Sequence, residues 1–340
     1  MDILKKTIPI ILPFLLTGCY ETFDPKIDTK PVLCLSSMIT AGSPIEVKVS
    51  RTWLFTDIEG SKDHSVDDAV LRIYANGSPV DAGYRPEQGD HIRIVASSAR
   101  YGEAEAEVTV PIATRISGIE FKNKMESLWT MDTPGWGIDA TIKFGINISM
   151  TLEDKGNTDN FYFLTDKTYC PSSPDEDEDN FYEDTKNSFR ISLSSGNFES
   201  VDPVFYEQTG AFEEVMNYSS FNKFFSDRLL DRETNTLNFG FTPCYFEISG
   251  WNGDPDELEC GWKITLQSIS ESYYNWLAYT WQTDGIVFGD FADMGLAEPI
   301  WGYSNVSTGA GVVAAKSSTT VEINIKDFLL ETLETKAGDQ

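Results

Sequence analysis

The stretch Ile142-Lys-Phe-Gly-Ile-Asn-Ile-Ser-Met150 decides the fold class of this chain. Every second position is a large apolar residue, and the positions between them are Lys, Gly, Asn and Ser. Successive side chains of an extended strand point to opposite faces, so this period of two is typical of a half-buried strand. The stretch therefore predicts a β-strand with one face in a core and the other toward water.

The same alternation recurs on both sides of this stretch. Further strands are predicted at residues 45–50, 91–94, 103–110, 237–241 and 321–326. The pair Asn76-Gly77 follows another apolar run and tolerates the positive φ of a tight hairpin turn. The chain is thus predicted to be mostly β, with an N-terminal immunoglobulin-like β-sandwich followed by a larger β-sandwich domain with a few short helices.

The predicted order of segments follows from where these patterns begin and stop. We expect a signal peptide at residues 1–18, a polar tether at 19–30, the immunoglobulin-like sandwich at 31–114, and a larger β-rich domain at 115–335 with acidic-aromatic loops. A chain of 340 residues suits two domains.

The N-terminus has the pattern of a bacterial lipoprotein signal. Two lysines precede an apolar run that ends in Leu16-Thr17-Gly18-Cys19. A transmembrane helix needs about 20 apolar residues, and this run is shorter. Cleavage is predicted between Gly18 and Cys19, and Cys19 would then carry acyl chains such as palmitate, which give stable membrane attachment when two or more are present. The competing interpretation is an ordinary secretory signal followed by a chance cysteine.

The chain is strongly acidic, with a formal net charge of −28 at pH 7. Such a surface repels nucleic acid, so nucleic-acid binding is not expected. It permits divalent cations without showing that any bind. The run Asp175–Asp179 is an obvious candidate, but the twelve-residue calcium loop beginning there would place Asn180 and Lys186 where Gly and Glu are required. A solvated loop is the favoured interpretation.

Four cysteines follow Cys19, and they allow three disulfide connectivities. Cys34 lies in an apolar run and is predicted to be a buried free thiol. Cys244 and Cys260 flank an acidic loop and are the favoured disulfide pair, in a compartment that permits oxidation. Their spacings do not fit a zinc site, and no metal is predicted.

One helix is predicted after Ser270, which suits an N-cap. Tyr273, Trp276 and Trp281 recur at helical spacing, so one face of the helix is aromatic. These rings could stack on a sugar and contact a ligand. Core packing is the more usual role of aromatics at this spacing and is the favoured interpretation. A second short helix is predicted at residues 327–335.

No familiar catalytic pattern occurs in the sequence. There is no Gly-x-Ser-x-Gly elbow, His-Glu-x-x-His motif or Gly-rich phosphate loop, and only two histidines are present. Paired carboxylates for glycan hydrolysis remain an alternative, but the 54 acidic residues make any one pair uninformative. We therefore expect a protein that is not an enzyme and binds no cofactor. The glycines before residue 312 predict a tight bend or a close backbone approach ahead of a buried strand.

Several short motifs follow one another along the chain after Cys19. They are Asp68-Ala69-Val70 to Asn76-Gly77, Val110-Pro111, Asp159-Asn160-Phe161-Tyr162, Phe225-Ser226-Asp227, Leu266 to Tyr274, Glu298-Pro299, and Ser304-Asn305-Val306 with the following Gly309-Ala310-Gly311. In this order they resemble the outer-membrane lipoprotein family catalogued as domain of unknown function 4249, and the resemblance covers nearly all of the chain after Cys19. Val312-Val313 departs mildly from the larger residues that often follow the Gly-x-Gly in this family.

The resemblance implies a role beside an outer-membrane transporter, since members are often encoded next to TonB-dependent transporters. We expect a lipid-anchored, non-enzymatic accessory protein of the outer membrane, on its periplasmic or cell-surface face. It would contact membrane lipid through Cys19 and bind a substrate for, or dock on, a TonB-dependent transporter. The alternatives are a surface hydrolase of glycan or peptide that uses paired carboxylates, and a structural or adhesive surface protein.

Overall fold

The structure is a computed structural model of the 340-residue chain. It describes residues 30–52, 64–81, 83–134, 137–153, 159–170, 190–206, 223–230, 235–251, 254–284 and 302–337. The predicted signal peptide, the cleavage site at Gly18 and Cys19, the tether up to residue 29 and the acidic run 175–179 lie outside these residues. No helix within the described part is both long and apolar enough to cross a membrane.

The first sandwich packs a four-stranded sheet against part of a six-stranded sheet. The smaller sheet has the order β4 (Ser78–Val80), β3 (Val70–Ala75), β5 (His91–Ser98) and β6 (Gly102–Thr109). It faces β1 (Leu33–Thr40), β2 (Lys48–Arg51) and the start of β15 (Ala310–Asn324). The β3–β4 hairpin turns at Asn76 and Gly77, which have φ of 51° and 80°, as their sequence predicted.

The second sandwich uses the rest of the six-stranded sheet and a five-stranded sheet. The five-stranded sheet consists of β10 (Arg190–Ser194), β13 (Thr236–Trp251), β8 (Gly137–Glu153) and β7 (Arg115–Thr133) in that order, with β11 (Asn197–Ser200) also paired to β13. Opposite it are β12 (Phe224–Ser226), β9 (Phe161–Tyr169), β14 (Gly261–Ile269) and the end of β15. The stretch 142–150 lies in β8, and its five apolar side chains are fully buried in this core.

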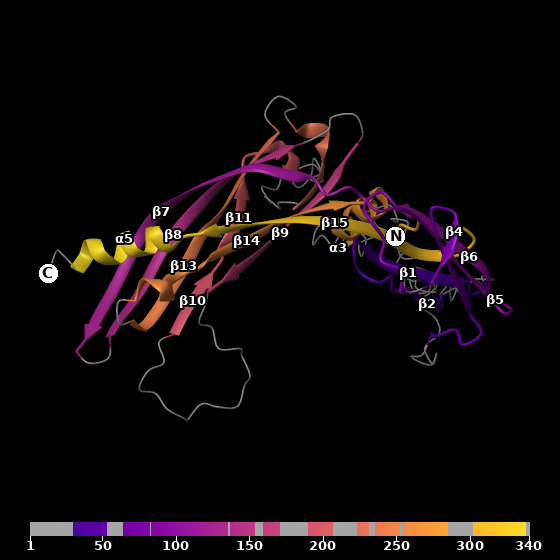
Figure 1. Ribbon diagram of the computed structural model, residues 1–340, viewed down its shortest axis with the longest axis horizontal. Coiled ribbons are helices and arrows are strands. Elements are labelled where there is room, and N and C mark those ends of the chain that lie inside the picture. The colour runs from indigo at the N-terminus through magenta and orange to yellow at the C-terminus, as the bar shows by residue number, and fades with distance from the viewer. Residues whose placement is uncertain are drawn as a thin grey trace, which may run out of the picture. The chain divides into compact units, whose positions relative to one another are not determined.

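Strand β15 belongs to both sandwiches (Figure 1). Its first half, residues 310–316, pairs in parallel with β1, and its second half, residues 316–324, pairs antiparallel with β14. Val313 and Ala315 lie in the first core, whereas Ile323 lies in the second. The contacts accordingly group Val32–Gln340 into one compact unit.

Two α-helices are described, α3 (Glu271–Asp284) and α5 (Lys326–Ala337). Ser270 caps α3 as predicted, because its Oγ accepts a hydrogen bond of 3.3 Å from the Tyr273 amide. Short 3₁₀ turns occur at η2 (Pro203–Tyr206), η3 (Asp227–Leu229) and η4 (Pro255–Leu258). The predicted fold class, mostly β with stacked sheets and a few short helices, is confirmed.

The predicted Cys244–Cys260 disulfide is wrong. Cys260 is bonded to Cys170, with their Cα atoms 4.3 Å apart. The reason is the register of β9 and β14: Tyr169 lies opposite Gly261, so the two cysteines are the next residues to face each other. Cys244 is a buried free thiol in the opposite sheet, and burial raises its pKa. Cys34 is free as predicted, but it is only half-buried.

Candidate binding site between the two sandwiches

A cavity of about 610 Å³ lies where β6 leaves the first sandwich and α3 begins in the second. This volume is in the range of sites for small ligands or side chains of a partner. One wall comes from the end of β6 and the connection to β7, and the other from β9, β14 and the start of α3. The lining residues with side-chain charge or aromatic character are Glu107, Asp159, Phe161, Glu271 and Tyr303.

The connection from β6 to β7 is fixed to the six-stranded sheet by hydrogen bonds. Ser317 Oγ donates to the Pro111 carbonyl at 2.6 Å, and Thr319 Oγ1 donates to the Thr114 carbonyl at 2.8 Å. The Thr114 amide donates to Ser268 Oγ at 3.0 Å. Because side chains of β14 and β15 hold this connection, the first wall of the cavity keeps a defined position beside the second.

The serine hydroxyl groups at the start of α3 form hydrogen bonds to the backbone of β15. Ser270 Oγ accepts the Ala315 amide at 3.0 Å, and the Ser270 amide donates to the Ala315 carbonyl at 2.9 Å. Ser272 Oγ donates to the Val313 carbonyl at 2.9 Å. These bonds tie α3 to β15, so the two hydroxyl groups have a positioning role in the wall.

Asn305 completes the wall by pairing with the same strand. Its Nδ2 donates to the Val313 carbonyl at 2.8 Å, and its Oδ1 accepts the Val313 amide at 2.9 Å. The amide side chain thereby acts like one more residue of a neighbouring strand. It positions the segment before β15, which carries Tyr303 into the cavity.

The β9 side of the cavity is held by Asp227. Its Oδ2 accepts the Asn160 amide at 3.1 Å and the Asn160 Nδ2 at 2.9 Å, while the Asp227 amide donates to the Asn160 carbonyl at 3.0 Å. The neighbouring Asp159 pairs with Arg228 at 3.3 Å, but both side chains are more than half exposed. That ion pair is weak because water and salt screen it.

The electrostatic character of the cavity is acidic. Among the described residues that line it, three carry carboxylates and none is Lys, Arg or His. Tyr303 has a pKa raised mainly by burial; a hydrogen bond with Asn275 opposes this rise, and the Glu271 charge adds to it. Glu271 lines the cavity at the start of α3, and its side chain is exposed.

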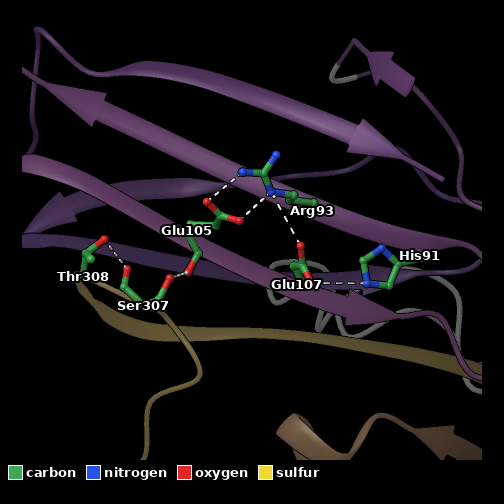
Figure 2. Close-up of polar contacts among 6 residues, drawn as sticks. All are labelled: His91, Arg93, Glu105, Glu107, Ser307 and Thr308. Atoms are coloured by element: carbon green, nitrogen blue, oxygen red, sulfur yellow. Dashed lines mark hydrogen bonds and ion pairs between the residues drawn. The ribbon is translucent and has the colours of Figure 1, made fainter. Parts of the chain in front are cut away.

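A charged ladder on β5 and β6 adjoins the cavity through Glu107 (Figure 2). Arg93 donates two hydrogen bonds to Glu105, at 2.5 and 2.8 Å, and this lowers the pKa of the Glu105 carboxyl. Glu107 lies farther away, 3.6 Å from Arg93 Nε and 3.6 Å from His91 Nε2. The Arg93 guanidinium is therefore mainly committed to Glu105, and Glu107 is held loosely.

The segment before β15 also joins this ladder. Ser307 and Glu105 exchange backbone hydrogen bonds of 2.7 and 3.1 Å, and Thr308 Oγ1 donates to the Glu103 carbonyl at 2.6 Å. Figure 2 shows Ser307 and Thr308 beside Glu105 of β6. The segment that supplies Tyr303 and Asn305 to the cavity is thus anchored on both sandwiches.

The aromatic residues predicted to contact a ligand lie elsewhere on α3. The ring of Tyr273 packs edge-on against Phe163 at 6.3 Å, and that of Trp281 against Phe224 at 6.4 Å, both on the six-stranded sheet. Trp276 is 38% exposed and contacts Tyr273. None of these three residues lines the cavity described above, and their ligand contact stays a prediction.

The sequence did not single out Glu107 or Tyr303, and no local signal marks them. Several motifs of the family resemblance do meet here: Val110-Pro111, Asp159–Phe161, residues 268–272 and Asn305 all line the cavity. Their order along the chain was visible in the sequence, but their convergence on one cavity was not. No group of three His, Cys, Asp or Glu in the described part is arranged to hold a metal ion.

The family model described as a domain of unknown function, DUF4249, matches residues 20–322. The chain belongs to the DUF4249 family. The matched region of this DUF4249 protein includes both sandwiches, the cavity and nearly all of β15. No curated protein and no solved structure matches the chain significantly.

Proposed function

We propose that this DUF4249 protein is a lipid-anchored accessory protein of the outer membrane. In this proposal it acts without catalysis, by binding a substrate for a TonB-dependent transporter or by docking on it. The family match supports the anchor, because it begins at residue 20, directly after Cys19. The region shared with the family thus begins one residue after the predicted cleavage site, and it extends to residue 322.

Binding is favoured over catalysis because the serine hydroxyl groups in the cavity already form structural hydrogen bonds. Ser268, Ser270 and Ser272 all bond to the backbone of neighbouring segments. A nucleophilic serine needs a general base within hydrogen-bond reach, and no histidine is found among the described lining residues. The cavity therefore has the properties of a recognition site: walls held in place by hydrogen bonds, some accessible apolar surface and carboxylates open to a ligand.

The anchor is tested by changing Cys19 to Ala in the full chain. Cells are labelled with a palmitate analogue, and the protein is followed through membrane fractionation. The unchanged protein should incorporate label and sediment with outer membrane, whereas C19A should incorporate none and leave the membrane fraction. Equal labelling of the two proteins would contradict the proposed anchor.

The partner is tested by co-purification. Outer membranes are solubilised in detergent, the lipidated protein is isolated through a C-terminal tag, and bound proteins are identified by mass spectrometry. A TonB-dependent transporter should be recovered in a stable ratio to the tagged chain. Recovery without any transporter, from membranes that contain transporters, would refute the docking form of the proposal.

Glycan or peptide hydrolysis is the second candidate, and the carboxylates of the cavity favour it among catalytic functions. Acid–base hydrolysis needs two carboxyl groups on opposite sides of the scissile bond, about 5 to 10 Å apart. Hydrolysis of envelope glycans or peptides by the purified chain, abolished in Glu271→Gln, would replace the binding proposal by this one.

A further inference from the structure

The lining of the cavity combines two kinds of surface. Its apolar residues Val108, Val110, Phe161 and Ile269 are buried. The apolar surface that a ligand can reach comes from the half-buried Pro111 and from Ile112, which is 64% exposed. A group that enters this cavity therefore meets apolar surface at these two residues.

The charged part of the lining consists of three carboxylates with weak or no partners. Glu107 lies 3.6 Å from Arg93 Nε and 3.6 Å from His91 Nε2, and Asp159 forms one exposed ion pair with Arg228. Glu271 takes part in no ion pair within the described part of the chain. Because the serine hydroxyls are already engaged, these carboxylates supply the strong acceptors still open to a ligand.

We propose that this cavity receives an arginine side chain on an extended segment of a partner protein. The proposal rests on the proposed function, since it names the chemistry by which the docking partner is recognised. Arginine combines an apolar stem with a planar group of five N–H donors and no acceptor. The stem matches the apolar surface of Pro111 and Ile112. The guanidinium matches Glu271, which has no ion pair among the described residues, and Glu107 and Asp159, whose ion pairs are exposed and weak.

Charge complementarity also favours this occupant over an acidic or neutral one. The whole chain carries a net charge of −28, so its field attracts cationic segments and speeds their encounter. A metal ion is a poorer fit, because the described residues hold no group of three ligating side chains. A free anion is disfavoured by the carboxylates themselves.

The test uses the full lipidated chain in detergent and an immobilised, capped peptide of sequence Ser-Leu-Arg-Ser-Leu-Arg-Ser. Binding is measured by biolayer interferometry at two salt concentrations. A second peptide carries citrulline in place of each arginine, which keeps the shape and removes the charge. The arginine peptide should bind saturably and less tightly at high salt, and the citrulline peptide should bind at least tenfold more weakly. Equal binding of both peptides would overturn the proposal.

Variants locate the binding. Glu271→Gln should weaken the arginine peptide roughly threefold to fivefold, the range for a partly exposed ion pair. Thr109→Trp, on the exposed lining of the cavity, should block entry without changing charge. Glu120→Gln, an exposed residue of β7 outside the cavity, is the matched charge control and should leave binding unchanged. An equal loss in Glu120→Gln and Glu271→Gln would show attraction by net charge alone and refute the site.

The same variants separate this inference from the proposed function. Each is carried into the co-purification experiment, with thermal melting as the control for folding. Loss of the transporter together with peptide binding in Thr109→Trp supports both proposals. Retention of the transporter by a variant that no longer binds peptide refutes the arginine contact and leaves the accessory role standing.

Discussion

The disulfide between Cys170 and Cys260 is predicted to be a major source of stability. It joins the end of β9 to the start of β14, at the point where the two strands leave the sheet. Replacing Cys170 by Ala removes this crosslink and frees the residues between the two cysteines in the unfolded chain. The unfolded state then gains conformational entropy, which lowers the free energy of unfolding.

The size of this effect follows from the length of the closed loop. The cysteines are 90 positions apart in the sequence. The chain-entropy relation for a loop of that length gives about 4.5 kcal/mol at 25 °C. Single domains have total stabilities of about 5–15 kcal/mol, so this loss is a large fraction of the whole.

The assay is urea unfolding followed by tryptophan fluorescence, with and without dithiothreitol. Under oxidising conditions Cys170→Ala should unfold at a much lower urea concentration than the unchanged chain. Reductant should shift the unchanged chain to the midpoint of the variant and leave the variant where it is. Cys34→Ser is the matched control, because Cys34 is a free thiol and its variant should keep the full response to reductant.

Two results would refute this reasoning. One is an unchanged chain whose unfolding curve does not respond to reductant even after complete reduction is verified. The other is a peptide map of the oxidised protein in which Cys260 is linked to Cys244 rather than to Cys170. The second result would also show that the register of β9 and β14 differs from the one described.

Three further predictions concern the strands and loops around the cavity. Gly311→Ala should lower the free energy of unfolding, measured with urea, by at least about 2 kcal/mol, because φ at Gly311 is 110° and a Cβ there would lie 2.0 Å from the Leu35 carbonyl oxygen of β1. The control is Gly42→Ala, where φ is similarly positive but the space is open, and it should lower this free energy by only about 1 kcal/mol. Equal losses in the two variants would contradict the close approach at Gly311. Ser317→Ala should lower the free energy of unfolding by about 1–3 kcal/mol in the same measurement, because it removes the hydroxyl that donates to the Pro111 carbonyl. An unchanged free energy of unfolding would show that water replaces the hydroxyl. Hydrogen bonds from Tyr84, Glu87 and Asn76 lower the pKa of Asp90, so the ionised Asp90 stabilises the fold above about pH 4, and this stabilisation is lost as pH falls through the lowered pKa. Asp90→Asn should therefore be less stable than the unchanged chain at about pH 7, and the difference should shrink below about pH 4. A difference in stability that is constant with pH would refute this role of the Asp90 carboxylate.

Local patterns in the sequence predicted many of the strands of this protein. They missed β7 (Arg115–Thr133), whose pairing with β8 shifts register between Ile116 and Gly118 and between Met125 and Ser127. The alternation from Ile142 to Met150 predicted β8 because side-chain direction in a strand depends only on position along that strand. The Asn76-Gly77 turn and the Ser270 cap were likewise predicted from one or two residues, since their conformations are set locally. For the glycines before residue 312 the sequence left a tight bend and a close backbone approach open, and the close approach occurs between Gly311 and β1.

The pairing of strands was decided only by the tertiary structure. Nothing in the sequence of β15 shows that its first half pairs in parallel with β1, which lies far away along the chain. The correct disulfide depends on the register of β9 against β14, so reasoning from the loop between Cys244 and Cys260 gave the wrong partner. The cavity exists because the shared strand β15 and its hydrogen bonds hold the connection at Pro111 beside the start of α3. Periodicity fixes which face of a strand is buried, but long-range packing selects its neighbours, and the candidate site depends on those neighbours.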